Sequence, residues 1–184
     1  TGRIVRASAR AITSGAWSPP VDLSRPGADH PAIAIAGDGS SVVVWDRAGT
    51  IESTSRGSSG AFSPPVSLST GAGTARFPTV AVDSAGDALV GWFQEGGSFG
   101  APRTISSSGG LTDAPKLDGP ALALNADGRA VAAWRRRSGG PLRIEATVRT
   151  AGQDWGTTTV LSPTTARNVG RPALGMDAGG HAVV

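Results

Sequence analysis

Residues 120–134, with the sequence PALALNADGRAVAAW, decide the fold because the same pattern occurs four times in the chain. The other copies lie at residues 31–45 (PAIAIAGDGSSVVVW), 78–92 (PTVAVDSAGDALVGW) and 172–184 (PALGMDAGGHAVV). Every copy begins with proline and carries a glycine eight residues later, and the three longer copies end in tryptophan. Copies spaced by about 40 to 50 residues indicate a repeat protein, in which one supersecondary unit is used several times.

The first part of each copy alternates small residues with large apolar ones. In residues 120–134, Ala121 and Ala123 alternate with Leu122 and Leu124. Because neighbouring side chains on a strand point to opposite faces, this pattern predicts a strand with one flat face and one bulky face. Both faces are apolar, so we expect both to be covered, with the bulk of one sheet against the flat face of the next. The equivalent large residues are Ile33, Ile35, Val80, Val82, Leu174 and Met176.

A tight turn and a second strand complete each copy. The recurring glycines are Gly39, Gly86, Gly128 and Gly180. Glycine at the end of a short polar turn predicts a left-handed residue that closes a hairpin. The tryptophans that end the second strand, Trp45, Trp92 and Trp134, could stack on sugars, but their strict recurrence favours packing between sheets.

A second unit separates these copies. Residues 51–56 (IESTSR) and 60–69 (GAFSPPVSLS) form it, with counterparts at 5–24 and 144–162 and a degraded counterpart at 103–118. Each counterpart is typical of a short strand, a glycine turn and another strand. No window carries apolar residues at helical spacing over ten or more positions, so the chain is predicted to be all-β.

Two alternating hairpins make one four-stranded unit, and the sequence therefore predicts a β-propeller built of four-stranded antiparallel blades. About four blade equivalents form a single domain, residues 1–184, which divides into 1–24, 25–69, 70–118, 119–162 and 163–184. The first and last pieces are half blades. We expect the chain to be a segment of a larger propeller. The alternatives are that the two half blades close a four-bladed ring, or that another chain completes the last blade.

The composition narrows the function classes. The 184 residues contain no cysteine, which excludes disulfides and thiol catalysis. The net charge is only +3 at pH 7, and the dominance of arginine over the single lysine, Lys116, indicates a GC-rich genome. No nucleic-acid partner is expected, since clustered charge is what marks such a surface. The sequence contains no run of eighteen apolar residues, so no membrane span is predicted. We expect a secreted or cell-surface protein whose export signal lies outside these residues.

Residues 60–69, Gly-Ala-Phe-Ser-Pro-Pro-Val-Ser-Leu-Ser, together with the hairpin that follows, resemble the repeats of sialidase-like β-propellers of secreted bacterial proteins. The resemblance covers nearly the whole chain and implies the fold rather than an activity. Of that family's Asp box, Ser-x-Asp-x-Gly-x-Thr-Trp, only the aromatic residue is kept, at Trp17, Phe62 and Trp155. The family's catalytic nucleophile is a tyrosine, and this chain has none, so no sialidase site can be completed within it.

The candidate binding residues are those that break the repeat. Arg135, Arg136 and Arg137 could hold carboxylates or phosphates by bidentate hydrogen bonds. The alternative is a solvated loop whose charges keep a sheet edge from pairing. Equivalent positions in the other copies carry different residues, so we expect the fold not to fix this run. Phe77, Phe93 and Phe99 also break the pattern and are candidates for a binding face.

Other motifs are assigned to turns. Asp83 and Asp87 are the best pair for a calcium ion, but one or two carboxylates per turn favour a plain turn, and no metal or cofactor is expected. Ser98 lies in a Gly-x-Ser-x-Gly string, which acts as a nucleophile elbow only where a strand turns into a helix. No helix is expected after it. His30 and His181 are interpreted as turn residues.

These observations favour a non-catalytic extracellular recognition or scaffold module, which binds glycans or a protein partner on a face built from non-repeating loop residues. The first alternative is a part of a glycan-active enzyme of glycoside hydrolase type, whose paired carboxylates cannot be found from spacing along the chain. The second alternative is a structural component of an extracellular assembly.

Overall fold

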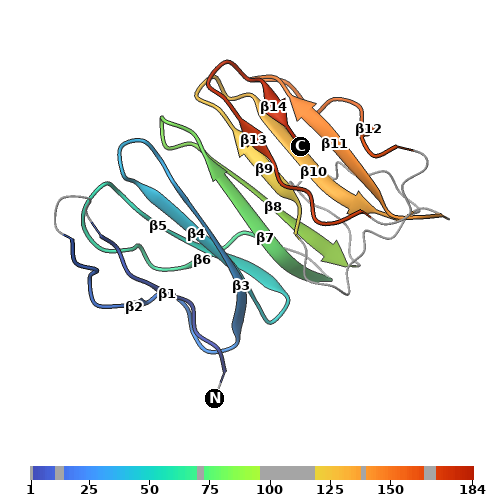
Figure 1. Cartoon of the computed structure of the whole chain (residues 1–184). Coiled ribbons are helices and arrows are strands. Elements are labelled where there is room, and N and C mark those ends of the chain that lie inside the picture. Colours follow the sequence, from blue (N-terminus) through green and yellow to red (C-terminus); the bar gives the residue numbers. More distant parts are fainter. Residues whose placement is uncertain (1, 11–14, 70–72, 96–118, 138–139, 164–168) are drawn as a thin grey trace.

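The structure is a computed structural model that describes residues 2–10, 15–69, 73–95, 119–137, 140–163 and 169–184 (Figure 1). Within these ranges the chain is all-β, as predicted, and contains no helix. The same ranges therefore hold no helix long and apolar enough to cross a bilayer.

Fourteen strands make up the described fold. The first seven are β1 (Arg6–Ala7), β2 (Val21–Asp22), β3 (Ala28–Ile35), β4 (Ser41–Arg47), β5 (Thr50–Arg56), β6 (Val66–Ser67) and β7 (Thr74–Val82). The others are β8 (Ala88–Glu95), β9 (Ala121–Leu124), β10 (Ala130–Arg136), β11 (Arg143–Arg149), β12 (Thr159–Val160), β13 (Gly175–Met176) and β14 (Ala182–Val183).

The strands form several small antiparallel sheets. Two sheets have four strands, in the orders β3-β4-β5-β6 and β12-β11-β10-β9, so that strands consecutive in the chain are neighbours. Three sheets, β1–β2, β7–β8 and β13–β14, have two strands each. The four copies of the repeated pattern become the hairpins β3–β4, β7–β8, β9–β10 and β13–β14. The second unit becomes β1–β2, β5–β6 and β11–β12, and its degraded copy at 103–118 lies outside the described residues.

The four hairpin turns have one geometry, which confirms the prediction from their glycines. In the first turn, the Ala36 amide donates to Ser40 O at 2.8 Å, and the Gly39 amide donates to Ala36 O at 3.0 Å. Gly39 has a φ of 88°, and the three equivalent glycines also have positive φ. This is a type I turn followed by a left-handed residue, a connection that suits the twist of a hairpin.

Consecutive hairpins pack against one another in chain order (Figure 1). β3 and β4 contact β7, β7 and β8 contact β9, and β9 contacts β13. A Cβ atom added to Gly91 would lie 3.1 Å from Leu122 Cδ1, so a large side chain of one copy meets a glycine of the copy before it. The large residues of the second, third and fourth copies are half-buried in this way. Bulk therefore packs against a flat face, as the alternation predicted.

Two of the three recurring tryptophans are fully enclosed. Trp45 is 0% exposed and Trp134 is 3% exposed, and Trp92 is half-buried. An indole that is removed from water in this way serves packing rather than sugar stacking. The expectation of a packing role is confirmed for Trp45 and Trp134.

The first copy departs from the prediction that both faces of the leading strand are covered. Ile33 is 56% exposed and Ile35 is 65% exposed, so the bulky face of β3 lies open and the prediction is wrong there. The physical reason is that no described hairpin precedes β3 in the stack at this point, whereas each later copy has a neighbour on that side. Within the described ranges the sheets do not close into a ring (Figure 1), and the propeller stays a prediction.

The turn geometry predicts that Gly39→Ala lowers the free energy of unfolding by about 1 kcal/mol, because a Cβ atom disfavours the left-handed conformation. Chemical denaturation measures this change. Gly37→Ala, two residues earlier, is the matched control, since Gly37 has no positive φ and its Cβ atom would meet nothing within 4 Å. Equal stability of the two variants would contradict the assigned turn.

Candidate functional site

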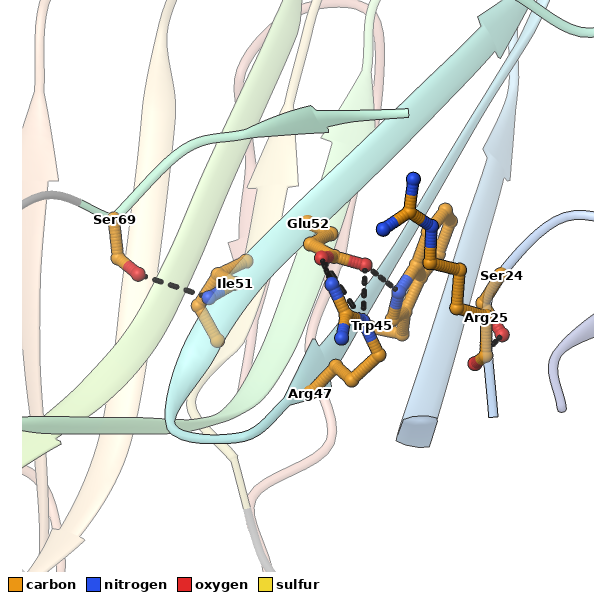
Figure 2. Close-up of polar contacts among 7 residues, drawn as sticks. All are labelled: Ser24, Arg25, Trp45, Arg47, Ile51, Glu52 and Ser69. Atoms are coloured by element: carbon orange, nitrogen blue, oxygen red, sulfur yellow. Dashed lines mark hydrogen bonds and ion pairs between the residues drawn. The ribbon is translucent and has the colours of Figure 1, made fainter. Parts of the chain in front are cut away.

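A buried polar contact joins the second strand of the first copy to the strand that follows it. Trp45 on β4 lies directly opposite Glu52 on β5. The Trp45 indole Nε1 donates to Glu52 Oε2 at 2.7 Å, and Arg47 Nε donates to Glu52 Oε1 at 3.0 Å. Figure 2 shows the carboxylate of Glu52 between the indole and the guanidinium. Glu52 is 8% exposed, and a buried charge is costly unless it is hydrogen-bonded. Both carboxylate oxygens of Glu52 accept hydrogen bonds, which offsets this cost.

The same contact recurs in the second four-stranded sheet. Trp134 Nε1 donates to Glu145 Oε2 at 3.2 Å, and Arg136 Nη1 lies 3.1 Å from Glu145 Oε1. Arg136 occupies the position of Arg47, two residues after the tryptophan, and is buried. The expectation that the fold does not fix the arginine run is therefore wrong for Arg136.

The acidic partner was missed in the sequence, although a signal for it was present. Glu52 and Glu145 both follow isoleucine, in IEST and IEAT, and each is the only acidic residue of its strand. Aligning the two strands from the turn between them places each glutamate opposite the tryptophan, and this would have predicted the pair. In β1 the equivalent position is Arg6, which donates to Asp22 instead.

The hairpins of the second unit, β1–β2, β5–β6 and β11–β12, also share their contacts. Ser24, Ser69 and Ser162 each accept a hydrogen bond at Oγ, from the amides of Val5, Ile51 and Ile144 respectively, and Figure 2 shows Ser69 with Ile51. In each of these hairpins an arginine also lies over an aromatic ring. The Arg Cζ atom is 5.4 to 5.6 Å from the ring centroid in the pairs Arg10–Trp17, Arg56–Phe62 and Arg149–Trp155. These recurring contacts belong to the fold.

A cluster that does not recur lies where the hairpin strands begin and end. His30 and Phe77 precede the prolines of the first and second copies, both at bulges and both with positive φ, 48° and 54°. Asp46 and Phe93 follow the tryptophans of the same copies. We call these four residues the rim cluster.

Asp46 holds the rim cluster together. His30 Nδ1 lies 2.7 Å from Asp46 Oδ2, and the Phe77 amide donates to the same oxygen at 3.1 Å. The His30 and Phe77 ring centroids are 4.3 Å apart, and Phe77 and Phe93 are 6.5 Å apart, in edge-to-face geometry. Asp46 is 8% exposed, while the His30 side chain is 28% exposed. One buried carboxylate therefore fixes a partly exposed imidazole and the backbone of the next sheet.

Non-glycine residues with positive φ cost about 1 kcal/mol or more and persist only where other contacts hold them. Two such residues at equivalent positions, in contact with each other, mark the rim cluster as a candidate site. The interpretation of His30 as a turn residue is wrong, because it lies at a bulge within β3. His181 does lie in a hairpin turn, where its amide donates to Asp177 Oδ1 at 2.8 Å.

The structure does not bring the predicted binding residues together at one place. Phe93 belongs to the rim cluster and is half-buried on β8. Arg135, at the end of β10, holds the position equivalent to Asp46 and Phe93, and is also half-buried. Arg137 is exposed just beyond β10. Phe99 and Ser98 lie outside the described residues.

The aspartates of the second turn serve the backbone. Asp83 is 5% exposed, and its Oδ1 accepts hydrogen bonds from the amides of Ala85 and Asp87, both at 2.9 Å. This carboxylate therefore acts as a turn residue. In the described ranges no group of three or more histidine, aspartate or glutamate side chains is placed to hold a metal ion.

No known family model matches this chain, and no curated protein matches it either.

The buried contact around Glu52 predicts that Glu52→Gln lowers the free energy of unfolding by about 2 kcal/mol at pH 7, because a charged hydrogen-bond acceptor is lost. Denaturant unfolding measures the effect. Asp22→Asn removes an acid from the exposed pair with Arg6, whose side chains are 53% and 61% exposed, and should cost less than about 1 kcal/mol. A larger loss for Asp22→Asn than for Glu52→Gln would refute the assignment.

The same contact makes stability depend on pH. Burial alone raises the pKa of Glu52, but hydrogen bonds from Arg47 and Trp45, with the charges of Arg47 and Arg25, outweigh it and lower the pKa below its ordinary value. A carboxylate with a lowered folded-state pKa adds stability above the unfolded pKa, and this is lost as pH falls through the folded value. The stability difference between wild type and Glu52→Gln should therefore shrink below about pH 4. A difference that grows on acidification would contradict this account.

Proposed function

We propose that this chain is part of a β-propeller and that it acts as a non-catalytic recognition module, which binds a glycan or a protein partner at the rim cluster. The fold part of the proposal is supported by the two four-stranded sheets with consecutive antiparallel strands and by the packing of successive hairpins. These are the features expected of propeller blades.

The observation that carries the binding role is the contrast between recurring and non-recurring contacts. The tryptophan–glutamate–arginine contact occurs in both four-stranded sheets, and the serine contact occurs at Ser24, Ser69 and Ser162. Directly beside them, the residues before proline and after tryptophan change from copy to copy: His30 and Asp46, Phe77 and Phe93, and Gly119 and Arg135. A repeat scaffold that keeps its interior and varies one row of positions is typical of a binding surface.

The variable positions are neighbours in space. His30 contacts Phe77, and a Cβ atom added to Gly119 would lie 2.5 Å from Phe77 O, so the second and third sheets also meet there. Three residues of this row are half-buried rather than enclosed, namely His30, Phe93 and Arg135. An aromatic ring beside a hydrogen-bonding imidazole and a cation suits the apolar face and hydroxyl groups of a sugar, or a mixed protein surface.

A glycan-active enzyme is the competing proposal, and the His30–Asp46 pair is the observation that favours it. A buried carboxylate that orients an imidazole is an arrangement found in acid–base catalysis. We favour binding because Asp46 also accepts from the Phe77 amide, which gives its carboxylate a role in the fold. In either case we propose an exported protein, since glycans and their protein partners are extracellular.

Phe93→Ala tests the binding proposal, because it removes the ring at the edge of the rim cluster. Screening on a glycan array should yield at least one ligand, and the variant should weaken its binding by about tenfold, as expected for a lost aromatic contact. Trp17→Ala is the matched control, since Trp17 is an exposed aromatic residue at a recurring outer position. It should leave binding unchanged.

Two outcomes would overturn the proposal. The first is binding that Trp17→Ala weakens as much as Phe93→Ala does. The second is turnover of chromogenic glycosides that Asp46→Asn abolishes while the circular dichroism spectrum stays that of the wild type. That result would assign an enzyme instead.

A further inference from the structure

The hairpins of the stack run in the same direction, so the described molecule has two distinct ends (Figure 1). At one end the hairpin turns meet, and a Cβ atom added to Gly86 would lie 3.7 Å from Ser40 Oγ of the preceding turn. At the other end the rings of His30 and Phe77 meet, with centroids 4.3 Å apart. We call these the turn end and the rim end.

Exposed arginines gather at the rim end. Arg76 directly precedes Phe77 of the rim cluster, and Arg25 lies near Glu52 (Figure 2). The exposed arginines of this end that form no ion pair with an acid of the described ranges are Arg25, Arg76, Arg137 and Arg171. They come from successive parts of the stack, so the positive charge extends along the whole end.

The acids of the rim end do not offset these charges. Within the part of the chain that the structure describes, all but one of them are buried or paired with an arginine, namely Asp22, Asp29, Asp46, Glu52 and Glu145. The exception is Glu95, which is exposed at the end of β8. The exposed surface of the rim end therefore carries an excess of positive charge.

The turn end has a different character. Each hairpin turn exposes an aspartate, and these are Asp38, Asp87, Asp127 and Asp177. Arginines accompany them, among them the exposed Arg10 and Arg129, so the charges of this end are mixed. The small net charge of +3 averages over a basic end and a mixed end, and such clustering is what a ligand responds to.

From this separation we propose that the ligand of the rim end is an acidic glycan, a linear polysaccharide that carries sulfate or carboxylate groups along its chain. The inference rests on the recognition role proposed above and names its ligand class. Guanidinium groups bind such oxyanions by paired, charge-assisted hydrogen bonds. Because the arginines lie on successive sheets, a chain with repeated charges contacts several of them at once, which strengthens individually weak contacts.

A nucleic acid carries the same repeated charge but suits the rim end less well. Surfaces that bind single strands present aromatic rings on which successive bases stack. The described rings of the rim end face one another instead, since Phe77 is 7% exposed and lies between His30 and Phe93. One half-buried ring, Phe93, suits a single sugar better than a row of bases.

Binding of fluorescein-labelled dextran sulfate to the 184-residue chain, followed by fluorescence anisotropy, tests the proposal. Unsulfated dextran of the same length is the matched neutral polymer. We expect only dextran sulfate to bind. Its affinity should fall by about tenfold or more between about 50 and 200 mM salt, because the contacts are ionic and exposed.

Charge-removing variants locate the contact. Arg76→Gln combined with Arg137→Gln should weaken binding of dextran sulfate by about tenfold, because two charge-assisted contacts are lost. Arg10→Gln combined with Arg129→Gln removes the same charge from the turn end, and this matched control should leave binding unchanged. Glu95→Gln should act in the opposite direction and strengthen binding by about twofold, because it removes the exposed acid of the rim end.

Three outcomes would overturn the inference, provided that circular dichroism shows each variant to be folded. The first is the absence of dextran sulfate binding at low salt. The second is equal weakening by the two double variants, which would show a response to net charge alone. The third is tighter binding of a single-stranded DNA of equal charge, which would assign a nucleic acid instead.

Phe93→Ala separates this inference from the proposed function. Binding of a neutral glycan that depends on Phe93, without binding of dextran sulfate, would overturn the inference and leave the recognition role intact. Binding of dextran sulfate that the rim-end arginine variants weaken and Phe93→Ala does not would support the inference and contradict the role given to the rim cluster.

Discussion

The hydrogen bond from the Trp45 indole to the Glu52 carboxylate is the interaction on which the rest of the structure depends. It places a charge inside an apolar stack, which is costly unless every oxygen is satisfied. The indole and Arg47 supply those hydrogen bonds, and the same arrangement is repeated at Trp134. A shift of β4 against β5 by one residue would turn the tryptophan away from its acid, so the contact also fixes the register of the sheet.

With register fixed, the faces of each hairpin acquire defined roles. One face of the leading strand is flat and the other bulky, and successive copies fit together as Gly91 fits Leu122. The residues at the ends of the strands do not take part in this packing of a bulky face against a flat one, and at these positions the copies differ. His30 and Phe77 adopt strained backbone conformations that Asp46 supports, while the strand residues between these ends and the hairpin turns follow the repeat. The division between a constant interior and a variable rim is the basis of the proposed recognition role.

Much of the fold follows from local pattern. The glycine turns, the alternation of small and large residues and the packing of Trp45 could be predicted, because turn chemistry and strand periodicity act over a few residues. The partner of the tryptophan could also have been found from the repeated Ile-Glu pair at Glu52 and Glu145.

Other features depend on residues far apart in the chain, and no local pattern reports them. The exposure of Ile33 depends on which hairpin lies beside it, and alternation on both faces shows only that some neighbour is required. The strained conformation of His30 depends on Asp46, which lies sixteen residues further along the chain. A histidine before a proline carries no sign of that carboxylate.

Hydrogen exchange of the tryptophan indole N–H groups, followed by NMR, tests the central contact most directly. The chain has five indole N–H groups, and those of Trp45 and Trp134 donate to buried carboxylates, whereas Trp17 is 67% exposed. The account predicts that the first two exchange more slowly than Trp17, by about a hundredfold or more. Exchange of all five at the rate of a solvated indole would contradict it.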